Sequence, residues 1–298
     1  MDRLYAIEAF VTVAELKSFA AAARTLEVSP PSVTRAVAAI EARLGSRLFH
    51  RTTRQVRLTD TGERYLAHCQ RVLDEINAAD AAATSTQAEP RGPLTVTASQ
   101  MFGRRFVAPV MLDFLARHPQ VDGRLVLLDR VTDLIEEGFD VAVRIASLAD
   151  SALTAVRVGE VRRVVCAAPG YLKARGTPRY PGDLVDHDGI AFAPVSVGDP
   201  WTFRVGSKRL TATTPRTLLK VNDTEVAIAA ALAGRGITRL LSYQVADEIR
   251  SGRLKILLEK FEPAPIPIHL VHREGRRANA RVRAFIDFAA PRLRAALA

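Results

Sequence analysis

The sequence lacks an apolar run long enough to cross a membrane. Its longest such run, Val226 to Ala233, has eight of the 298 residues, whereas a spanning helix needs about 18 or more. The first residues also lack the continuous apolar centre of a secretory signal, because Glu8 and Glu15 interrupt them. We therefore expect a protein without a membrane segment that stays in the cytoplasm.

Cysteine is scarce, and the common catalytic motifs are missing. Cys69 and Cys166 stand 97 positions apart, with no CxxC and no neighbouring His–Cys spacing, so neither a disulfide framework nor a zinc site is predicted. The sequence has no P-loop, HExxH or GxSxG motif, and its six histidines are scattered. Gly234-Arg235-Gly236 lacks the third glycine of a dinucleotide fingerprint. We expect no enzyme, no metal and no cofactor.

Acidic residues are outnumbered by basic ones, 32 to 42, and the net charge is +10. The length predicts about two domains, and the 48% of hydrophobic residues is typical of globular proteins. Five arginines between Glu41 and Asp60 have no acid among them: Arg43, Arg47, Arg51, Arg54 and Arg57. This run fits either a solvated surface or an anionic partner.

Three helices are predicted within the first 45 residues. Apolar residues recur there at helical spacing, first Leu4, Ile7, Val11 and Ala14, then Phe19, Ala22 and Leu26. Ser29-Pro30 predicts the start of a third helix, because proline has no N–H to lose in the first turn, and Gly45 predicts its end. The second and third helices form a helix-turn-helix, whose later helix can enter the DNA major groove. The alternative is an ordinary three-helix packing unit.

Candidate DNA-binding residues lie at the start of the third helix and on the basic hairpin that follows it. Hydroxyl groups bond to several base edges and arginine suits guanine, whereas hairpin arginines suit phosphates or the minor groove. The predicted set is Ser29, Pro30, Pro31, Ser32, Thr34 and Arg35 on the helix, with Arg51, Thr53 and Arg54 on the hairpin.

A long helix is predicted from Thr59 to about Gln87, which contains no proline and one glycine. Its apolar residues repeat at a spacing of 3, 4 and 3, which suits pairing with another helix: Leu66, Cys69, Leu73 and Ile76. The alternative is a helix packed on its own chain. The Pro- and Gly-rich segment 89–93 then marks a domain boundary.

Beyond this boundary, strands alternate with helices, as in an α/β domain with a largely parallel sheet. The first strand contains Leu94, Val96 and Ala98. Helices are predicted over Phe102–Ala116, around Leu134 and Ile135, and over Asn222–Gly234. A late strand and helix follow over Ile266–Val271 and Ala280–Leu293.

Residues 1–65 resemble the winged helix-turn-helix of LysR-type transcriptional regulators. The most distinctive matches are Ser18-Phe19-Ala20, Ser29 to Arg35, Ile40-Glu41, Leu48-Phe49-His50-Arg51, and Leu58-Thr59 with Thr61-Gly62. Thr34 departs from the usual serine of the family but keeps the hydroxyl group. The remaining chain resembles the effector domain of the family in its segments GFDVAVRIA, VNDTEVAIAAALAGRGITRL, SGRLKILL and RVRAFIDF.

The resemblance implies an all-α winged helix-turn-helix domain over residues 1–58 and a linker and dimerisation helix over residues 59–89. It then implies an α/β two-lobed effector domain of the type 2 periplasmic-binding-protein kind over residues 90–298. Lobe I would cover about 92–161 and 268–298, and lobe II about 162–267. The implied function is binding of double-stranded promoter DNA as a homodimer or homotetramer, in response to a small-molecule effector between the lobes. An activator of this kind would also contact RNA polymerase.

A small anionic metabolite is the expected effector, because the first residues of a helix concentrate N–H groups and partial positive charge. Ser99-Gln100 stands where the first strand meets its helix, and the resemblance assigns the polar group of the effector to this junction. The predicted set is Ser99, Gln100, Asp129, Thr132, Arg144, Ala146, Trp201, Thr202 and Phe203. As alternatives, Ser99 is a helix N-cap, Arg144 pairs with Asp129, and Trp201 belongs to the core.

Two other classes of protein fit parts of this sequence. An α/β enzyme with a basic surface would need a catalytic constellation, which the sequence lacks. A solute-binding protein would need an export signal and would have no use for residues 1–58. The arginines from Arg273 to Arg283 are expected to form a solvated helix face.

Overall fold

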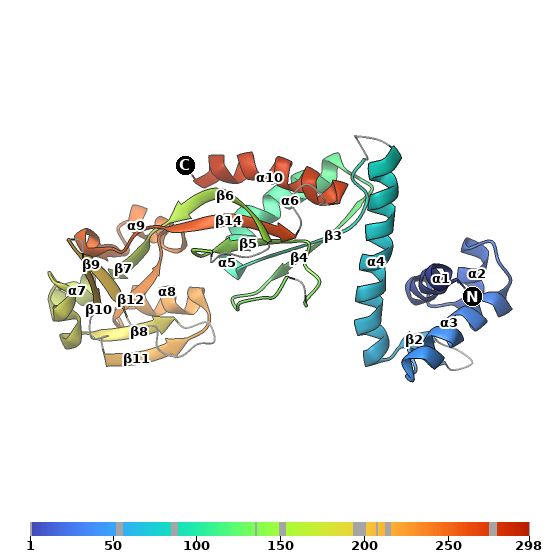
Figure 1. The fold of residues 1–298 in the computed structure, drawn as a ribbon. Coiled ribbons are helices and arrows are strands. Elements are labelled where there is room, and N and C mark those ends of the chain that lie inside the picture. The colour runs from blue at the N-terminus through green and yellow to red at the C-terminus, as the bar shows by residue number, and fades with distance from the viewer. Residues whose placement is uncertain are drawn as a thin grey trace. The chain divides into compact units, whose positions relative to one another are not determined.

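The computed structural model describes residues 2–51, 56–84, 89–134, 136–148, 153–192, 201–206, 208–211, 216–273 and 279–297. The chain forms two compact units, Met1–Glu89 and Pro90–Ala298 (Figure 1). None of the described helices is both long and apolar enough to cross a membrane.

Unit 1 opens with the three predicted helices, α1 (Arg3–Leu16), α2 (Phe19–Thr25) and α3 (Pro30–Leu44). Side chains cap the first two, since Asp2 accepts a hydrogen bond from the N–H of Leu4 and Ser18 accepts one from that of Ala21. Gly45 ends α3 with φ +63°, a conformation that glycine adopts without strain. Local signals in the sequence therefore predicted both ends of α3.

A short hairpin and a long helix complete unit 1. Strands β1 (Phe49–Arg51) and β2 (Val56–Leu58) pair antiparallel, and α4 covers Asp60–Thr84. The Glu41 carboxylate accepts hydrogen bonds from the N–H groups of Leu48 and Phe49, at 2.8 and 3.2 Å, and so holds the hairpin against α3. The core of the unit contains Phe10, Val33 and Val37, each fully buried.

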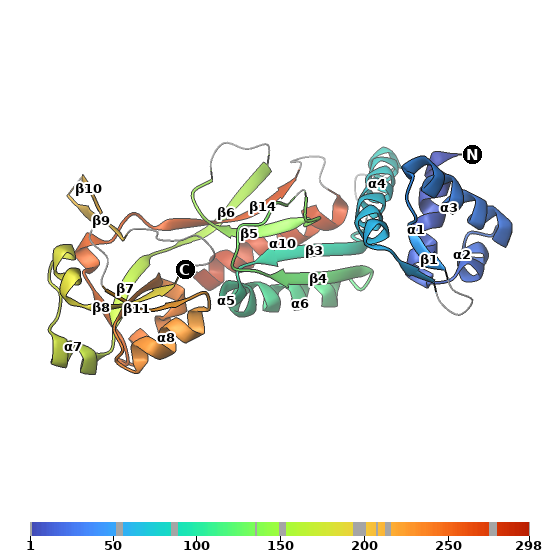
Figure 2. The same ribbon diagram turned by 90° about the horizontal axis from the view of Figure 1, so that it is seen from below.

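Unit 2 consists of two lobes, each built on a five-stranded sheet (Figures 1 and 2). The lobe I sheet has the order β4-β3-β5-β14-β6, with strands β3 (Gly92–Ala98), β4 (Val121–Leu127), β5 (Val141–Ile145), β6 (Leu153–Val161) and β14 (Ile266–Arg273). One face packs against a continuous helical segment, α5 (Gln100–Phe102), the π-helical turn η1 (Gly103–Val107) and α6 (Ala108–Arg117), and against α10 (Ala280–Leu297).

The lobe II sheet has the order β11-β8-β12-β7-β13. Its strands are β7 (Arg163–Ala167), β8 (Asp188–Phe192), β11 (Arg216–Val221), β12 (Ile237–Leu241) and β13 (Lys255–Leu257). Its helices are α7 (Pro169–Arg175), η2 (Pro181–Asp186), α8 (Thr224–Leu232), η3 (Ser242–Gln244), α9 (Ala246–Arg250) and η4 (Glu259–Phe261). A hairpin of β9 (Thr202–Val205) and β10 (Lys208–Thr211) stands at the end of lobe II away from lobe I (Figure 2).

Two sequence predictions for unit 2 were wrong. Each sheet is mixed rather than largely parallel, with two parallel and two antiparallel pairings, because the strands that pass between the lobes run against their neighbours. No helix forms around Leu134 in the described residues, which make turns there. Leu134 is instead a core residue beside Phe139 and Val271, and this packing explains its apolar side chain.

The chain passes between the lobes at Arg162, after β6, and returns through residues 262–265 into β14. These two segments are neighbours, since Ile266 of β14 pairs with Val161 of β6. The Arg162 guanidinium contacts Glu259 at 2.8 Å and Glu262 at 3.2 Å, and its backbone N–H donates to Ser242 Oγ at 3.1 Å. Arg162 thus ties the outgoing segment to the returning one.

Candidate DNA-binding helix and effector site

The start of α3 presents a polar face to solvent. Val33, Ala36 and Val37 turn inward and are fully buried, so helical spacing places Pro31, Thr34 and Arg35 on the opposite side. The other predicted DNA-binding residues of this helix lie at its N-terminal end. These residues are exposed, except for the half-buried Ser32: Ser29, Pro30, Pro31, Ser32, Thr34 and Arg35. All six helix residues of the predicted set therefore lie together at the start of α3.

Hydrogen bonds order this surface. The hydroxyl oxygens of Ser29 and Ser32 lie 2.8 Å apart, and Thr34 Oγ1 donates to the Pro30 carbonyl at 3.1 Å. Arg35 contacts the Pro31 carbonyl through Nε at 3.4 Å, a long bond that leaves its terminal nitrogens available. Hydroxyl groups and a guanidinium are the groups that read base edges.

The hairpin adds basic residues. Arg51 lies in β1 opposite Val56, but its side chain, Thr53 and Arg54 fall outside the described residues. His50 and Arg57 face each other across the hairpin and are both exposed. Neither was in the predicted set, although the alternation of side chains along a strand could have placed both on one face.

The predicted dimerisation stripe lies on α4, and most of it packs on its own chain. Leu66 and Leu73 contact the unit 1 core, and Cys69 is only 2% exposed within that core. Burial raises the pKa of the Cys69 thiol above its ordinary value. These three contacts fit the intrachain alternative. Ile76 is half-buried, so pairing of α4 with another copy through this stripe stays a prediction.

The predicted effector residues of lobe I meet where β3 joins α5. The Asp129 carboxylate accepts a hydrogen bond from the Gln100 N–H at 2.9 Å and so caps the helix, whereas the Ser99 side chain makes no capping bond. The Ser99 Oγ is buried and has no well-formed hydrogen bond to the described residues. A carboxylate therefore occupies the position that was expected to attract an anion.

Arg144 and Thr132 form a second part of this region. The Arg144 guanidinium donates to the Thr132 backbone carbonyl, and Thr132 is 8% exposed. Ala146 is held by its backbone, whose N–H donates to the Pro267 carbonyl at 3.1 Å. The alternative pair of Arg144 with Asp129 is not among the contacts that the structure describes.

The predicted contribution of the β9 region needs correction. Trp201 and Phe203 are 7% and 3% exposed and belong to the lobe II core, where they pack with Leu184 and Phe261. The Arg239 guanidinium lies 5.3 Å from the centre of the Trp201 ring. Thr202 starts β9 opposite Thr211. The core alternative for Trp201 is therefore confirmed, because apolar burial holds these rings inside lobe II.

Tyr243 of lobe II lies at this junction and was not in the predicted set. Its ring packs edge-on against Phe102 of lobe I, with centres 5.3 Å apart. Burial raises the pKa of the Tyr243 hydroxyl to about 12, while the nearby Ser99 and Gln244 oppose this rise. The phenol is therefore neutral at physiological pH and lies beside Ser99. A tyrosine that directly follows an apolar strand is too common a pattern to indicate this role.

Ion pairs also join the lobes around this junction. Arg104 contacts Glu225 at 2.6 Å, and Arg105 contacts Asp247 at 3.1 Å. No group of three or more His, Cys, Asp or Glu residues that could hold a metal ion occurs in the described parts of the chain. The junction offers the hydroxyl groups of Ser99 and Tyr243, the Asp129 carboxylate and the Arg144 guanidinium, which suit binding of a polar molecule.

Comparisons with known proteins cover both units. The family model for the LysR substrate binding domain matches residues 87–294, and the model for the bacterial regulatory helix-turn-helix protein, lysR family, matches residues 4–63. The HTH-type transcriptional regulator PtxR of Pseudomonas aeruginosa is 36% identical over 96% of this chain and 91% of its own. The uncharacterized HTH-type transcriptional regulator YhjC of Escherichia coli is 31% identical over 97% of both chains.

Solved structures agree with these matches. CrgA, a LysR-type transcriptional regulator from Neisseria meningitidis, is 30% identical and superposes with a TM-score of 0.60, covering 97% of this chain and 98% of its own. The Vibrio cholerae virulence activator AphB is 23% identical, with a TM-score of 0.58 over 97% of this chain and 98% of its own. The AphB match supports the fold alone.

Proposed function

Since the chain belongs to the LysR family of DNA-binding transcriptional regulators with an effector-binding domain, we propose that the start of α3 reads base edges in promoter DNA. The observation that carries this proposal is the exposed face of hydroxyl and guanidinium groups from Ser29 to Arg35. The hairpin, with Arg57 and the undescribed Arg54, would contact phosphates or the minor groove. The site of action would be the cytoplasm, where promoter DNA lies.

Substitutions on α3 and on the hairpin should have different effects on DNA binding. Arg35→Ala should cost about 1 to 3 kcal/mol on a cognate site and relax sequence preference, because it removes a base contact. Arg57→Ala should weaken all duplexes alike and reduce the salt slope by about one unit. The measurement is a titration of duplexes selected from a random pool by the full-length protein, compared with scrambled duplexes at several salt concentrations.

Arg209→Ala is the matched control, because it removes the same charge from the exposed β10 of lobe II. It should leave the affinity and the salt slope unchanged. If Arg35→Ala kept the affinity and base preference of the unsubstituted protein, α3 would not be the reading helix.

We also propose that a small-molecule effector binds at the junction of Ser99, Asp129 and Tyr243. The buried hydroxyl of Ser99, which has no well-formed hydrogen bond to the described residues, and the neutral hydroxyl of Tyr243 support a ligand that accepts hydrogen bonds there. The Asp129 carboxylate supports a ligand with a donor group, such as a hydroxyl, at the helix start. An anionic group of the effector would then pair with Arg144, away from Asp129.

Calorimetry on the full-length protein tests this site with pairs of small carboxylates that differ by one hydroxyl group. We expect the hydroxylated member of each pair to bind more tightly. Ser99→Ala and Asp129→Asn should each lower its affinity about tenfold, since each substitution removes a polar contact. Thr202→Ala is the control, because β9 lies in the lobe II hairpin. A ligand whose affinity neither substitution changed would bind elsewhere.

Assembly into a homodimer or homotetramer is the third proposal. Unit 2 exposes large apolar side chains along the edges of both sheets: Leu112 on α6 beside β4, Leu218 and Leu219 on the edge strand β11, and Val226 on α8. Exposed apolar residues beside unpaired strand edges favour association. Two joined copies would hold two helix-turn-helix units for a two-part DNA site.

A further inference from the structure

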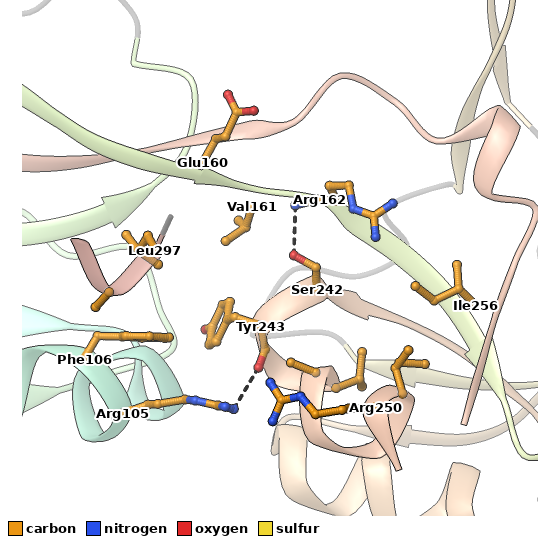
Figure 3. A pocket seen from close by; sticks show the side chains of 14 residues that line it. Arg105, Phe106, Glu160, Val161, Arg162, Ser242, Tyr243, Arg250, Ile256 and Leu297 are labelled. Carbon is orange, nitrogen blue, oxygen red and sulfur yellow. Dashed lines mark hydrogen bonds between the residues drawn. The ribbon is translucent and has the colours of Figure 1, made fainter. Parts of the chain in front are cut away.

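A pocket lies between the lobes, and Tyr243 is the one residue of its lining that also belongs to the proposed effector site (Figure 3). Its volume is about 440 Å³, which falls within the range of pockets that hold small molecules. Lobe I contributes η1 and the end of α10, and lobe II contributes η3 and α9. Much of the wall is apolar: Phe106, Val161, Val245, Ile249, Ile256 and Leu297.

Positive charge gathers at one side of this pocket. Arg105 of lobe I and Arg250 of lobe II both pair with Asp247, at 3.1 and 3.0 Å. Because two guanidiniums share one carboxylate, this side keeps one positive charge in excess. Figure 3 shows both guanidiniums below Tyr243, next to the apolar wall.

The other charged residues of the lining leave no positive charge in excess. Arg162 is paired with both Glu259 and Glu262. Glu160 pairs with Arg157 at 2.5 Å, and its carboxylate points away from the pocket (Figure 3). A negatively charged ligand would therefore be attracted to Arg105 and Arg250.

We propose that this pocket binds a small carboxylate with an apolar, aromatic body. The carboxylate would take charge-assisted hydrogen bonds from Arg105 and Arg250, and the body would lie against Phe106, Ile249 and Leu297. The Ser242 hydroxyl, which accepts a hydrogen bond from the Arg162 N–H, keeps its own proton for a further acceptor. Such a molecule touches both lobes and stabilises the arrangement of lobes in which these groups converge.

Tyr243 connects this pocket to the proposed effector site. Its backbone carbonyl accepts a hydrogen bond from Arg105 at 3.1 Å, its ring packs against Phe106 with centres 5.8 Å apart, and its hydroxyl lies beside Ser99. A ligand at Arg105 and one at Ser99 would therefore change each other's affinity by the same factor. This coupling rests on the proposed effector site, whereas binding in the pocket does not.

The test is calorimetry on the full-length protein with 4-phenylbutyrate, and with its neutral amide to isolate the charge. The acid should bind and the amide should bind at least about tenfold more weakly, because it lacks the charge-assisted bonds. Arg250→Gln should lower the affinity for the acid by a similar factor. Ala246→Trp should abolish binding, because the larger side chain fills the pocket. Arg253→Gln removes another exposed arginine of lobe II, which pairs with Glu248 outside this pocket, and should bind normally.

Three results would overturn the proposal. The first is that neither compound binds the unsubstituted protein. The second is that Arg250→Gln, with an unchanged melting temperature, binds the acid as the unsubstituted protein does. The third is that Ser99→Ala abolishes binding while Arg250→Gln does not, because the acid would then occupy the effector site. Failure of Ser99→Ala to affect any effector would refute the proposed effector site and leave this pocket standing.

Discussion

At the scale of single residues, His187 shows how burial decides a charge. Its side chain is 5% exposed, and its Nδ1 lies 3.2 Å from the Tyr171 hydroxyl, which accepts a hydrogen bond from the Asp188 N–H at 3.0 Å. The tyrosine proton is therefore directed at Nδ1, which accepts it only in the neutral ring. Burial lowers the pKa of His187 below 6.5 and Arg175 adds to the effect, while nearby aspartates oppose it.

The lowered pKa of His187 makes stability depend on pH. The unfolded chain binds a proton at this histidine at a higher pH than the folded chain does. The neutral His187 therefore contributes fully to the free energy of unfolding above about pH 7. This contribution is lost as the pH falls through the pKa of the folded protein. His187→Asn keeps an acceptor for Tyr171 but cannot titrate. We expect a flatter decline of the denaturant midpoint between about pH 7 and pH 5. An identical decline in both proteins would assign the acid sensitivity to other groups.

At the scale of secondary-structure elements, glycines in helices have two different roles. A Cβ at Gly62, in the first turn of α4, would lie 2.1 Å from the Leu48 carbonyl oxygen, whereas one at Gly170 in α7 would meet no atom within 4 Å. Gly62 thus permits the close approach of α4 to the hairpin. Gly170 has no comparable steric reason to be glycine.

Alanine at these two positions should change stability in opposite directions. Gly62→Ala should destabilise by about 1 to 3 kcal/mol, because backbone must move to make room. Gly170→Ala should stabilise by up to about 1 kcal/mol, because alanine loses less entropy in a helix. Urea unfolding of both variants measures the difference. Equal effects would mean that α4 moves away from Leu48 at little cost.

The elements that the sequence predicted well depend on local signals. Proline in the first turn marks the start of α3, and a glycine with positive φ marks its end. Both signals act through the local backbone and need no distant partner. Gly103, the first residue of the π-helical turn Gly103–Val107, depends on such a partner, because a Cβ there would lie 2.1 Å from the Leu127 side chain on β4. Trp201 is similar, since its burial depends on Leu184 and Phe261. Periodicity along one segment carries no information about such contacts.

The candidate sites follow the same rule. The exposed face of α3 that we propose to bind DNA could be predicted, because helical spacing alone separates Val33 and Val37 from Thr34 and Arg35. Of the proposed effector site, the sequence pointed to Ser99 and Asp129, because both follow the ends of strands. Tyr243 comes from the other lobe, about 140 positions later in the chain than Ser99, and only the folded arrangement brings it there.

At the scale of the whole molecule, assembly should depend on the exposed sheet edges of unit 2. The double variant Leu112→Glu, Leu218→Lys adds one charge of each sign and leaves the net charge unchanged. Both side chains are at least half exposed, at 68% and 50%. We expect the protein to dissociate to a smaller species in sedimentation and to bind two-part DNA sites more weakly, because charges at an apolar contact are costly to desolvate. The melting temperature of the monomer should not fall.

Val185→Glu is the control for this assembly test, since Val185 is 54% exposed on η2, which belongs to neither edge strand. Its mass in solution should match that of the unsubstituted protein. If the edge variant also kept that mass, the copies would associate through another surface, such as the exposed side of α4 with Val72.

The double passage of the chain between the lobes restricts how the lobes can turn. The two segments that join the lobes can bend together about an axis that crosses both of them. A twist of one lobe against the other would instead stretch one segment relative to the other. Arg162 bonds to Glu259 and Glu262 and so fixes the segments to each other at one point. Lobe II should therefore rotate as a lever with its pivot at Arg162, and a small angle there becomes a displacement that grows with distance and is greatest at the β9–β10 hairpin.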